Sequence, residues 1–423
     1  MAKTERREFI KKSLLGSAAI GIAPTILGKS DSLEPAPSNL IEVDWSSVQN
    51  QFLLSDDRYY MNTASLGPSP QTVLDAIQAW SKKLEMKGES GHGSIKKSRE
   101  YIAEHLNAFP EEIAFTRNTT EGVNIVARGL RLKAGDEVII TNHEHVGGAS
   151  PWIALAKENG VKIKVVELNL DGTGNVSVIR NAISDRTKVV FFSHVTCSNG
   201  MRLPVREICD VCREKDVLSF VDGAQAMGQI QIDLGYLKPD FYATSGHKWL
   251  LGPKGTGLLY INKEKLERIS PTFVGAYTVE NFDLENVKMD YVDAASREEY
   301  GTRDTPKIKG LEESFRFLQR IDMQRVENRG LELHDFLRTE LQDVRNIEIL
   351  SPEDKAFRSA IFTFRIEGKD YLEVQKELLQ TNNCRLRGIY EAKLNAIRVS
   401  CGIHLDLGDL RALVNGIRTI ALS

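Results

Sequence analysis

The chain has 423 residues, of which 41% are hydrophobic and 27% are charged, and its formal net charge at pH 7 is -3. This length exceeds the usual size of a single domain and allows a large core. A nearly neutral chain creates no basic field that would attract nucleic acid. The composition is ordinary for a soluble globular protein and favours neither a membrane-embedded nor a disordered one, and we expect no nucleic-acid partner.

Residues 1–28 differ from the rest of the chain. Paired Arg6 and Arg7 are followed by Phe9 and by an apolar run from Leu14 to Leu27. The run is rich in glycine and alanine and shorter than the about 20 residues of a membrane span. This order of features is typical of a twin-arginine signal, which a receptor reads. It predicts the twin-arginine export machinery as a partner and a periplasmic or membrane-tethered location. The alternative is a basic N-terminal helix.

The five cysteines do not form a recognisable pattern of disulfides or metal ligands. An odd number argues against a disulfide framework. Cys209 and Cys212 form a CxxC within a predicted helix, without the second pair that a zinc site needs. His143 and His145, in "NHEH", lack the spacing of a metalloprotease motif. We therefore predict no metal site.

Residues 29–54 are predicted to be a linker and an N-terminal arm, and two domains follow. From 55 to 310, apolar strand candidates such as "KVVFFSHV", "VLSFVDG" and "DFYATSG" alternate with helical patterns. This alternation predicts βαβ units and a largely parallel sheet with helices on both faces. From 311 to 423, long helical patterns and two further strand candidates predict a smaller α+β domain.

Polar residues lie where several predicted strands end, and ligands bind at this edge of a parallel sheet. Asp222 ends one strand and Gln225 follows it, whereas Ser245, His247 and Lys248 follow the next strand. Each signal alone has an ordinary explanation, since DG pairs usually make turns and most lysines are solvated. The segment "GPKGTG" lacks the GK[ST] of a phosphate-binding loop.

Together these residues meet the needs of pyridoxal phosphate. This cofactor requires a lysine for a Schiff base and a carboxylate against its ring nitrogen. The carboxylate keeps that nitrogen protonated, so that the ring can accept carbanion electrons. Thr119 and Thr120 precede a helical run, and hydroxyls and free N–H groups at a helix start form an anion site for the phosphate.

Four segments, "YMNTASLGPSP", "RNTTEGVNIVARGL", "VDGAQA" and "SGHKWLLGPKGTGLLY", resemble the class V aminotransferase family of fold-type I pyridoxal-phosphate enzymes. The resemblance covers roughly residues 55 to 420. It implies a large domain with a mostly parallel seven-stranded sheet, a smaller C-terminal domain, and a homodimer. The family includes cysteine desulfurases and isopenicillin N epimerase-like proteins.

The resemblance also implies roles for individual residues. Lys248 would form the Schiff base, Asp222 would lie at the ring nitrogen, Gln225 near the phenolic oxygen and His145 on the ring face. The phosphate ligands implied are Thr119, Thr120, Ser245 and His247, with Gly301 and Thr302 reaching the phosphate of the other subunit. Arg398 would bind the carboxylate of an amino-acid substrate, and Arg387 is a second candidate. A guanidinium suits this task because it binds a carboxylate through two hydrogen bonds.

In one region, this sequence differs from the cysteine desulfurases of the family, and the difference bears on the reaction. Cysteine desulfurases carry a nucleophilic cysteine on a mobile loop shortly before the substrate arginine. Here the corresponding region, "NNCRLRGIYEAKLNAIRVS", is too short for such a loop, and Cys384 precedes the predicted strand "LRG" instead of following it. We therefore expect an aminotransferase or an isopenicillin N epimerase-like enzyme. A desulfurase or lyase, and a non-catalytic protein that retains the fold, stay as alternatives.

Overall fold

The computed structural model describes residues 43–55 and 57–422. The predicted export signal, residues 1–28, and residues 29–42 of the predicted linker lie outside the described part. The chain divides into two units, residues 1–42 and 43–423, and the second holds all the elements below. Within the described residues, no helix combines the length and the apolar character needed to cross a membrane.

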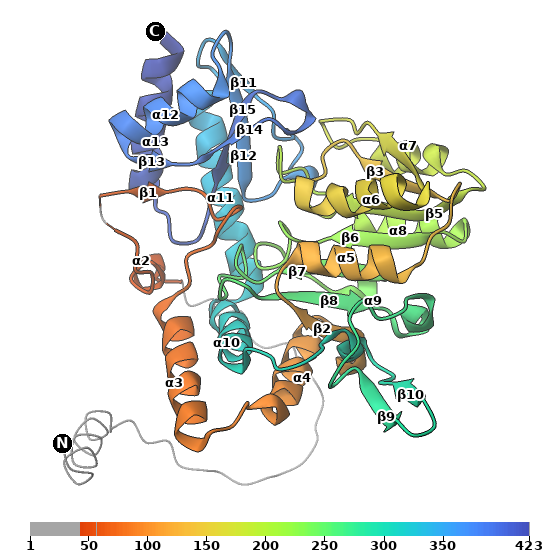
Figure 1. Cartoon of the computed structure of the whole chain (residues 1–423). Coiled ribbons are helices and arrows are strands. Elements are labelled where there is room, and N and C mark those ends of the chain that lie inside the picture. Colours follow the sequence, from red (N-terminus) through yellow and green to blue (C-terminus); the bar gives the residue numbers. More distant parts are fainter. Residues whose placement is uncertain (1–42, 56, 423) are drawn as a thin grey trace, which may run out of the picture. The chain divides into compact units, whose positions relative to one another are not determined.

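A sheet of seven strands forms the centre of the large domain (Figure 1). Its order is β2 (Ile113–Thr116), β8 (Gly257–Ile261), β7 (Phe241–Ser245), β6 (Leu218–Asp222), β5 (Thr187–Ser193), β3 (Glu137–Thr141) and β4 (Lys162–Val166). Only β8 runs antiparallel to its neighbours. The prediction of a mostly parallel seven-stranded sheet in a fold-type I enzyme is therefore confirmed.

Helices cover both faces of this sheet, which explains why its strands are apolar at nearly every position. In β5, Val189 and Phe191 pack on one face and Val190 and Phe192 on the other. The first face is covered by α5 (Thr119–Gly129) and α6 (Val146–Asn159). The second is covered by α7 (Asn175–Ala182) and α8 (Val205–Glu214), together with helices from elsewhere in the domain.

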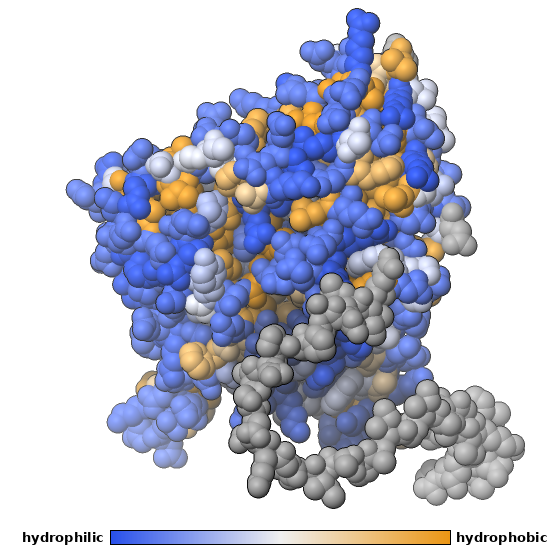
Figure 2. All heavy atoms as spheres, turned by 180° about the vertical axis from the view of Figure 1, so that it is seen from behind, coloured by the Kyte–Doolittle hydropathy of each residue, from blue (hydrophilic) through white to orange (hydrophobic). Residues whose placement is uncertain are grey.

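Several further elements complete the large domain. The helices are α2 (Trp45–Gln49), α3 (Gln71–Lys87), α4 (Ile95–His105), α9 (Leu234–Leu237) and α10 (Thr305–Ile321). A hairpin of β9 (Val279–Asp283) and β10 (Lys288–Tyr291) projects from the domain (Figure 1). The surface seen from behind is mostly polar, with apolar residues scattered among the polar ones (Figure 2). This distribution is ordinary for a folded protein.

The small domain is a second layer of sheet and helices. Its antiparallel sheet has the order β11 (Ile347–Ile349), β12 (Ile361–Ile366), β15 (Ala396–Ser400) and β14 (Arg387–Ile389). The helices are α11 (Met323–Leu341), α12 (Tyr371–Asn382) and α13 (Leu407–Leu422). The N-terminal β1 (Tyr59–Tyr60) pairs in parallel with β13 (Cys384–Arg385), so an early segment of the chain also belongs to this domain's core.

The predicted domain boundary at residues 310 and 311 falls inside α10. This helix packs against α3 and α4 of the large domain, whereas α11 contacts β12 and α13. The chain turns between the two helices at Asp322, which has a φ of 83°. The packing environment therefore changes at Asp322.

Candidate active site

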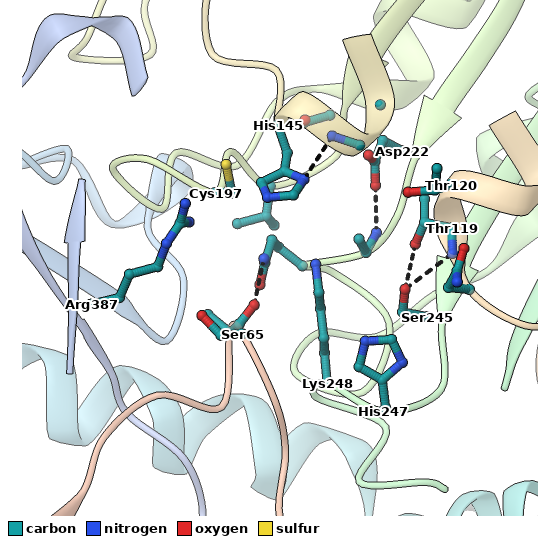
Figure 3. A pocket seen from close by; sticks show the side chains of 18 residues that line it. Ser65, Thr119, Thr120, His145, Cys197, Asp222, Ser245, His247, Lys248 and Arg387 are labelled. Carbon is teal, nitrogen blue, oxygen red and sulfur yellow. Dashed lines mark hydrogen bonds between the residues drawn. The ribbon is translucent and has the colours of Figure 1, made fainter. Parts of the chain in front are cut away.

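A cavity of about 350 Å3 lies at the carboxyl ends of the central parallel strands. Figure 3 shows side chains from several elements directed into this space. Nine of the predicted site residues line it, namely Thr119, Thr120, His145, Asp222, Gln225, Ser245, His247, Lys248 and Arg387. Three do not, namely Gly301, Thr302 and Arg398.

Lys248 lies in the turn that follows β7 and is partly buried. Burial lowers the pKa of its amine, and the charge of Asp222 opposes this shift. In the described part of the chain the amine has neither a hydrogen-bond partner nor an ion-pair partner. Gly67 packs closely against the backbone of Lys248. A Cβ added to Gly67 would lie 1.9 Å from the carbonyl oxygen of Lys248. The chain therefore holds an uncommitted amine at a fixed place in the cavity.

Asp222 is the last residue of β6, and its carboxylate is almost completely buried. Oδ1 accepts the backbone N–H of Ala224 at 2.8 Å. Burial raises the pKa of Asp222, whereas the positive charge of Lys248 lowers it. A Cβ on Gly148 would lie 3.1 Å from Oδ2, so a glycine there lets the first turn of α6 approach the carboxylate. One carboxylate oxygen is thus held by the backbone and the other is left for a ligand.

His145 is the N-cap of α6, and its Nδ1 accepts the N–H of Gly147 at 3.1 Å. Burial, followed by the charges of Lys248 and Arg387, lowers the pKa of His145 to about 4. The imidazole is therefore neutral near pH 7. Because Nδ1 accepts a hydrogen bond, the ring proton is on Nε2.

The start of α5 forms a group of hydroxyl and N–H donors. Ser245 Oγ accepts the N–H of Thr119 at 3.1 Å and lies 2.7 Å from Thr119 Oγ1 (Figure 3). Asn118 caps the helix by accepting the N–H of Glu121. Thr120 and His247 complete this side of the cavity. Free N–H groups at a helix start, together with hydroxyls, bind anions such as phosphate.

Gln225 lines the cavity with an amide that is fixed at both ends. Its Nε2 donates to the carbonyl oxygen of Ala64, and its Oε1 accepts the indole N–H of Trp249, both at 2.8 Å. Ala64 belongs to the segment that also carries Ser65, another cavity residue. The amide therefore links the N-terminal segment to the turn that carries Lys248.

The two predicted arginines have different environments. Arg398 is completely buried behind the cavity wall, and it donates to the carbonyl oxygen of Cys197 and to Ser65 Oγ, both at 2.8 Å. Burial, followed by the charge of Arg387, lowers the pKa of Arg398 to about 10. Its Nε is buried without a hydrogen-bond partner among the described residues. Arg387 lines the cavity itself and pairs with Glu391 at 2.6 Å.

Gly301 and Thr302 lie outside this cavity. Thr302 lines a separate cavity of about 340 Å3, together with Arg117 and Tyr300. Their segment follows Glu299, which is buried and ion-paired with Arg99 at 3.0 Å. The predicted contact of these two residues with the phosphate of another subunit stays a prediction.

Besides Asn118, which caps α5, three polar side chains that the sequence did not point to line the cavity, namely Ser65, Ser193 and Cys197. Ser65 lies in a motif that carried the resemblance, and this motif was a usable signal. Cys197 comes from a loop between β5 and α8, and only the fold brings it to the cavity. All five cysteines are unpaired thiols, and Cys209 and Cys212 lie in the core beneath the sheet.

Glu144, which precedes His145, supports the cavity from behind. It accepts hydrogen bonds from Thr141 Oγ1 at 2.6 Å and from the N–H and Oγ of Ser193 at 3.0 and 2.7 Å. Burial raises the pKa of Glu144 to about 7 from an ordinary value of 4.5, and the charge of Asp222 adds to this shift. Between about pH 4.5 and pH 7, the folded protein therefore retains a proton here that the unfolded chain has lost.

This proton predicts a pH dependence of stability. The favourable contribution of neutral Glu144 is complete below pH 4.5 and is lost as the pH rises toward 7. The shift corresponds to about 3 kcal/mol. Between pH 4 and pH 8, the free energy of unfolding of Glu144→Gln is therefore expected to fall less than that of the wild type. Urea unfolding at both pH values measures this difference. A Glu348→Gln variant, changed at an exposed position, is the control and should follow the wild type.

A model of the family described as "Aminotransferase class-V" matches residues 59–388. A probable cysteine desulfurase of Methanothermobacter thermautotrophicus is 29% identical over 87% of this chain and 92% of its own length. The isopenicillin N epimerase of Amycolatopsis lactamdurans is 30% identical over 77% and 86%, respectively.

Solved structures agree with these relatives. The apo cysteine desulfurase of Thermococcus onnurineus NA1 has 25% identity and a TM-score of 0.81, over 89% of this chain and 98% of that one. A lysine variant of C-DES with glycine covalently linked to its PLP cofactor has 27% identity and a TM-score of 0.79, over 88% and 98%.

Proposed function

Because the chain belongs to the class V aminotransferase family, a family of pyridoxal-phosphate enzymes, we propose that it transforms an amino acid at the α-carbon through Lys248. The reaction proposed is that of an aminotransferase or of an isopenicillin N epimerase-like enzyme. The observation that carries the proposal is the unpartnered Lys248 amine, which shares one cavity with Asp222 and His145.

The cavity residues fit pyridoxal phosphate. The free oxygen of Asp222 would hold the protonated ring nitrogen, and the neutral His145 ring would cover one face of the cofactor. Thr119, Thr120, Ser245 and His247 would bind the phosphate at the start of α5, and Gln225 would lie at the phenolic oxygen. When bound, the cofactor supplies an electron sink for the α-carbon of the substrate.

The chain's own groups account for proton transfer and orientation. The pKa of Lys248 is lowered by burial, so its amine is suited to accept the α-proton. Arg398, directly behind the lining residues Cys197 and Ser65, would orient the α-carboxylate through its positive charge, and its hydrogen bonds to these two residues hold the guanidinium still. The proton is then returned by Lys248 or by another acid. Its return to a different atom gives amino transfer, whereas its return to the opposite face of the α-carbon gives epimerisation.

The desulfurase alternative requires a reactive thiolate in the cavity. Among the described residues lining it, Cys197 is the one cysteine, and burial raises the pKa of its thiol to about 11. We therefore expect Cys197→Ala to retain most of the activity. We also expect iodoacetamide at pH 7.5 to leave Cys197 unlabelled in the native protein, as measured by peptide mass spectrometry. Rapid labelling of Cys197 with loss of activity would favour the desulfurase alternative.

Proton NMR in heavy water, with a panel of L- and D-amino acids, tests the proposed function. Loss of the α-proton signal together with formation of a keto acid, once an amino acceptor is added, would identify an aminotransferase. Exchange with inversion and without keto acid would identify an epimerase. The absence of exchange with every amino acid would contradict the proposal.

We further propose that two copies of the chain form a homodimer. The β9–β10 hairpin exposes Phe282, Leu284 and Val287, whose exposed fractions are 71%, 74% and 90%. A partner subunit would cover such side chains and would bring Gly301 and Thr302 to the phosphate. Light scattering after gel filtration tests this, and a monomer that retains its cofactor would contradict it.

Residues 1–28 support a separate proposal, namely that the twin-arginine machinery exports the protein, which is then periplasmic or tethered to the membrane. Replacing Arg6 and Arg7 together by lysine is expected to abolish export, because the receptor reads this pair. Cell fractionation of the two forms measures the result. Equal distribution of both would contradict this route.

A further inference from the structure

Two arginines lie directly opposite each other in the small-domain sheet. Arg387 in β14 and Arg398 in β15 are register partners of an antiparallel pair. Opposite side chains of such a pair lie on the same face, and like charges there repel each other. Arg387 accordingly contributes to the lowered pKa of Arg398. Without a further group, Arg387 in the cavity lining and Arg398 directly behind it would place two positive charges next to each other, which suit a substrate with two carboxylates.

Glu391 is the group that alters this balance. Its Oε1 accepts a hydrogen bond from Nη2 of Arg387 at 2.6 Å, and the Glu391 side chain is only 5% exposed. Its Oε2 is buried without a partner among the described residues. The hydrogen bonds of this carboxylate thus go to Arg387 alone, so each member of the pair neutralises the other.

The chain holds this carboxylate in place by an unusual local conformation. Glu391 begins the 3-10 turn Glu391–Lys393 between β14 and β15, and Ala392 and Lys393 adopt left-handed φ values of 51° and 58°. Such conformations are costly for residues other than glycine and persist where the surroundings enforce them. Ala392 and Leu394 pack in a small apolar cluster with Ile389.

We propose that Glu391 determines the substrate specificity of the cavity, because it neutralises Arg387 and leaves Arg398 alone to bind a carboxylate. This inference rests on the proposed function. The substrate class is amino acids with one carboxylate and an uncharged side chain. A second carboxylate on the substrate would have to displace Glu391 from Arg387, and a buried carboxylate left unpaired is strongly unfavourable.

The test compares isosteric pairs of amino acids, glutamine with glutamate and asparagine with aspartate. The readout is binding, measured as the concentration that half-saturates the change in visible absorption of the cofactor-loaded protein. The wild type is expected to bind the amide of each pair more tightly. Glu391→Gln leaves Arg387 with an uncompensated charge, so binding of the acid relative to its amide should strengthen about 10- to 100-fold.

Three further variants make the result specific. The double variant Arg387→Gln with Glu391→Gln removes both charges and should restore a preference close to that of the wild type. Glu391→Asp, which has a shorter side chain, should give an intermediate ratio of acid binding to amide binding. It replaces Glu391→Gln in the test if that variant does not fold. Glu348→Gln removes a carboxylate from an exposed pair with Arg365 in the same domain and should change nothing.

The outcomes separate the two proposals. If amides bind but the acid-to-amide ratio is the same in wild type, Glu391→Gln and Glu391→Asp, the role of Glu391 is overturned while the proposed function stands. If the wild type binds acids more tightly than amides, the substrate class is overturned. If no amino acid changes the spectrum of the wild type, the proposed function fails and the inference fails with it.

Discussion

Lys248→Ala is expected to abolish turnover, with a loss of at least about 10⁴-fold, because it removes both the covalent attachment and the proton acceptor. The purified variant should lose the visible absorption of bound cofactor after dialysis. Borohydride reduction should fix the cofactor to the wild type but not to the variant, which mass spectrometry of the intact protein measures.

Stability provides the control for this prediction. The Lys248 amine has no partner in the described structure, and burying it lowers its pKa, so its removal is not expected to destabilise the apo-protein. The free energy of unfolding should be unchanged or higher. Lys254→Ala, an exposed lysine six residues later, should keep full activity. A coloured, active Lys248→Ala enzyme would show that another residue holds the cofactor.

Asp222→Asn is expected to lower the turnover number by about 10²- to 10³-fold or more, the range found when one electrostatic group of an active site is removed. The amide keeps the shape of the carboxylate, and its oxygen can still accept the N–H of Ala224. Its charge is lost, so nothing at this position would hold the ring nitrogen protonated. Steady-state kinetics measures the loss.

The folded state of this variant is the necessary comparison. Burial raises the pKa of Asp222, so the ionised form is costly to the fold, and the asparagine variant should unfold at the same or a higher urea concentration. Asp222→Glu, which retains the charge but displaces it, should also lose activity. Full activity of Asp222→Asn would remove this carboxylate from the proposed mechanism.

Much of the fold and half of the site follow from local patterns. In β6 and β7, apolar runs end at Asp222 and Ser245, and parallel strands place their carboxyl ends at one edge of the sheet. This rule predicts Lys248 near Asp222, and both residues line the cavity. The sequence likewise predicts a helix just after Thr119 and Thr120, and the structure begins α5 at Thr119 itself, with Asn118 as its N-cap.

The change of packing at Asp322 could not be seen in the same way. The helices α10 and α11 both have amphipathic patterns and follow each other without a proline or glycine break. A pattern states which face of a helix is apolar but not which domain covers that face. The two helices are assigned to different domains by their contacts, because α10 packs on α3 and α11 contacts β12.

Local patterns thus predict the type of sheet and the edge at which the site lies, and the residues at two strand ends, Asp222 and Lys248, predict the cofactor, because each pattern can be recognised within a short segment. Which other side chains join Asp222 and Lys248 depends on how distant segments pack together. The register of β14 and β15 places Arg387 opposite Arg398, the turn at Glu391 neutralises one of the two, and the loop after β5 brings in Cys197. These relations depend on strand register and on contacts between distant segments, and no local pattern of residues encodes them.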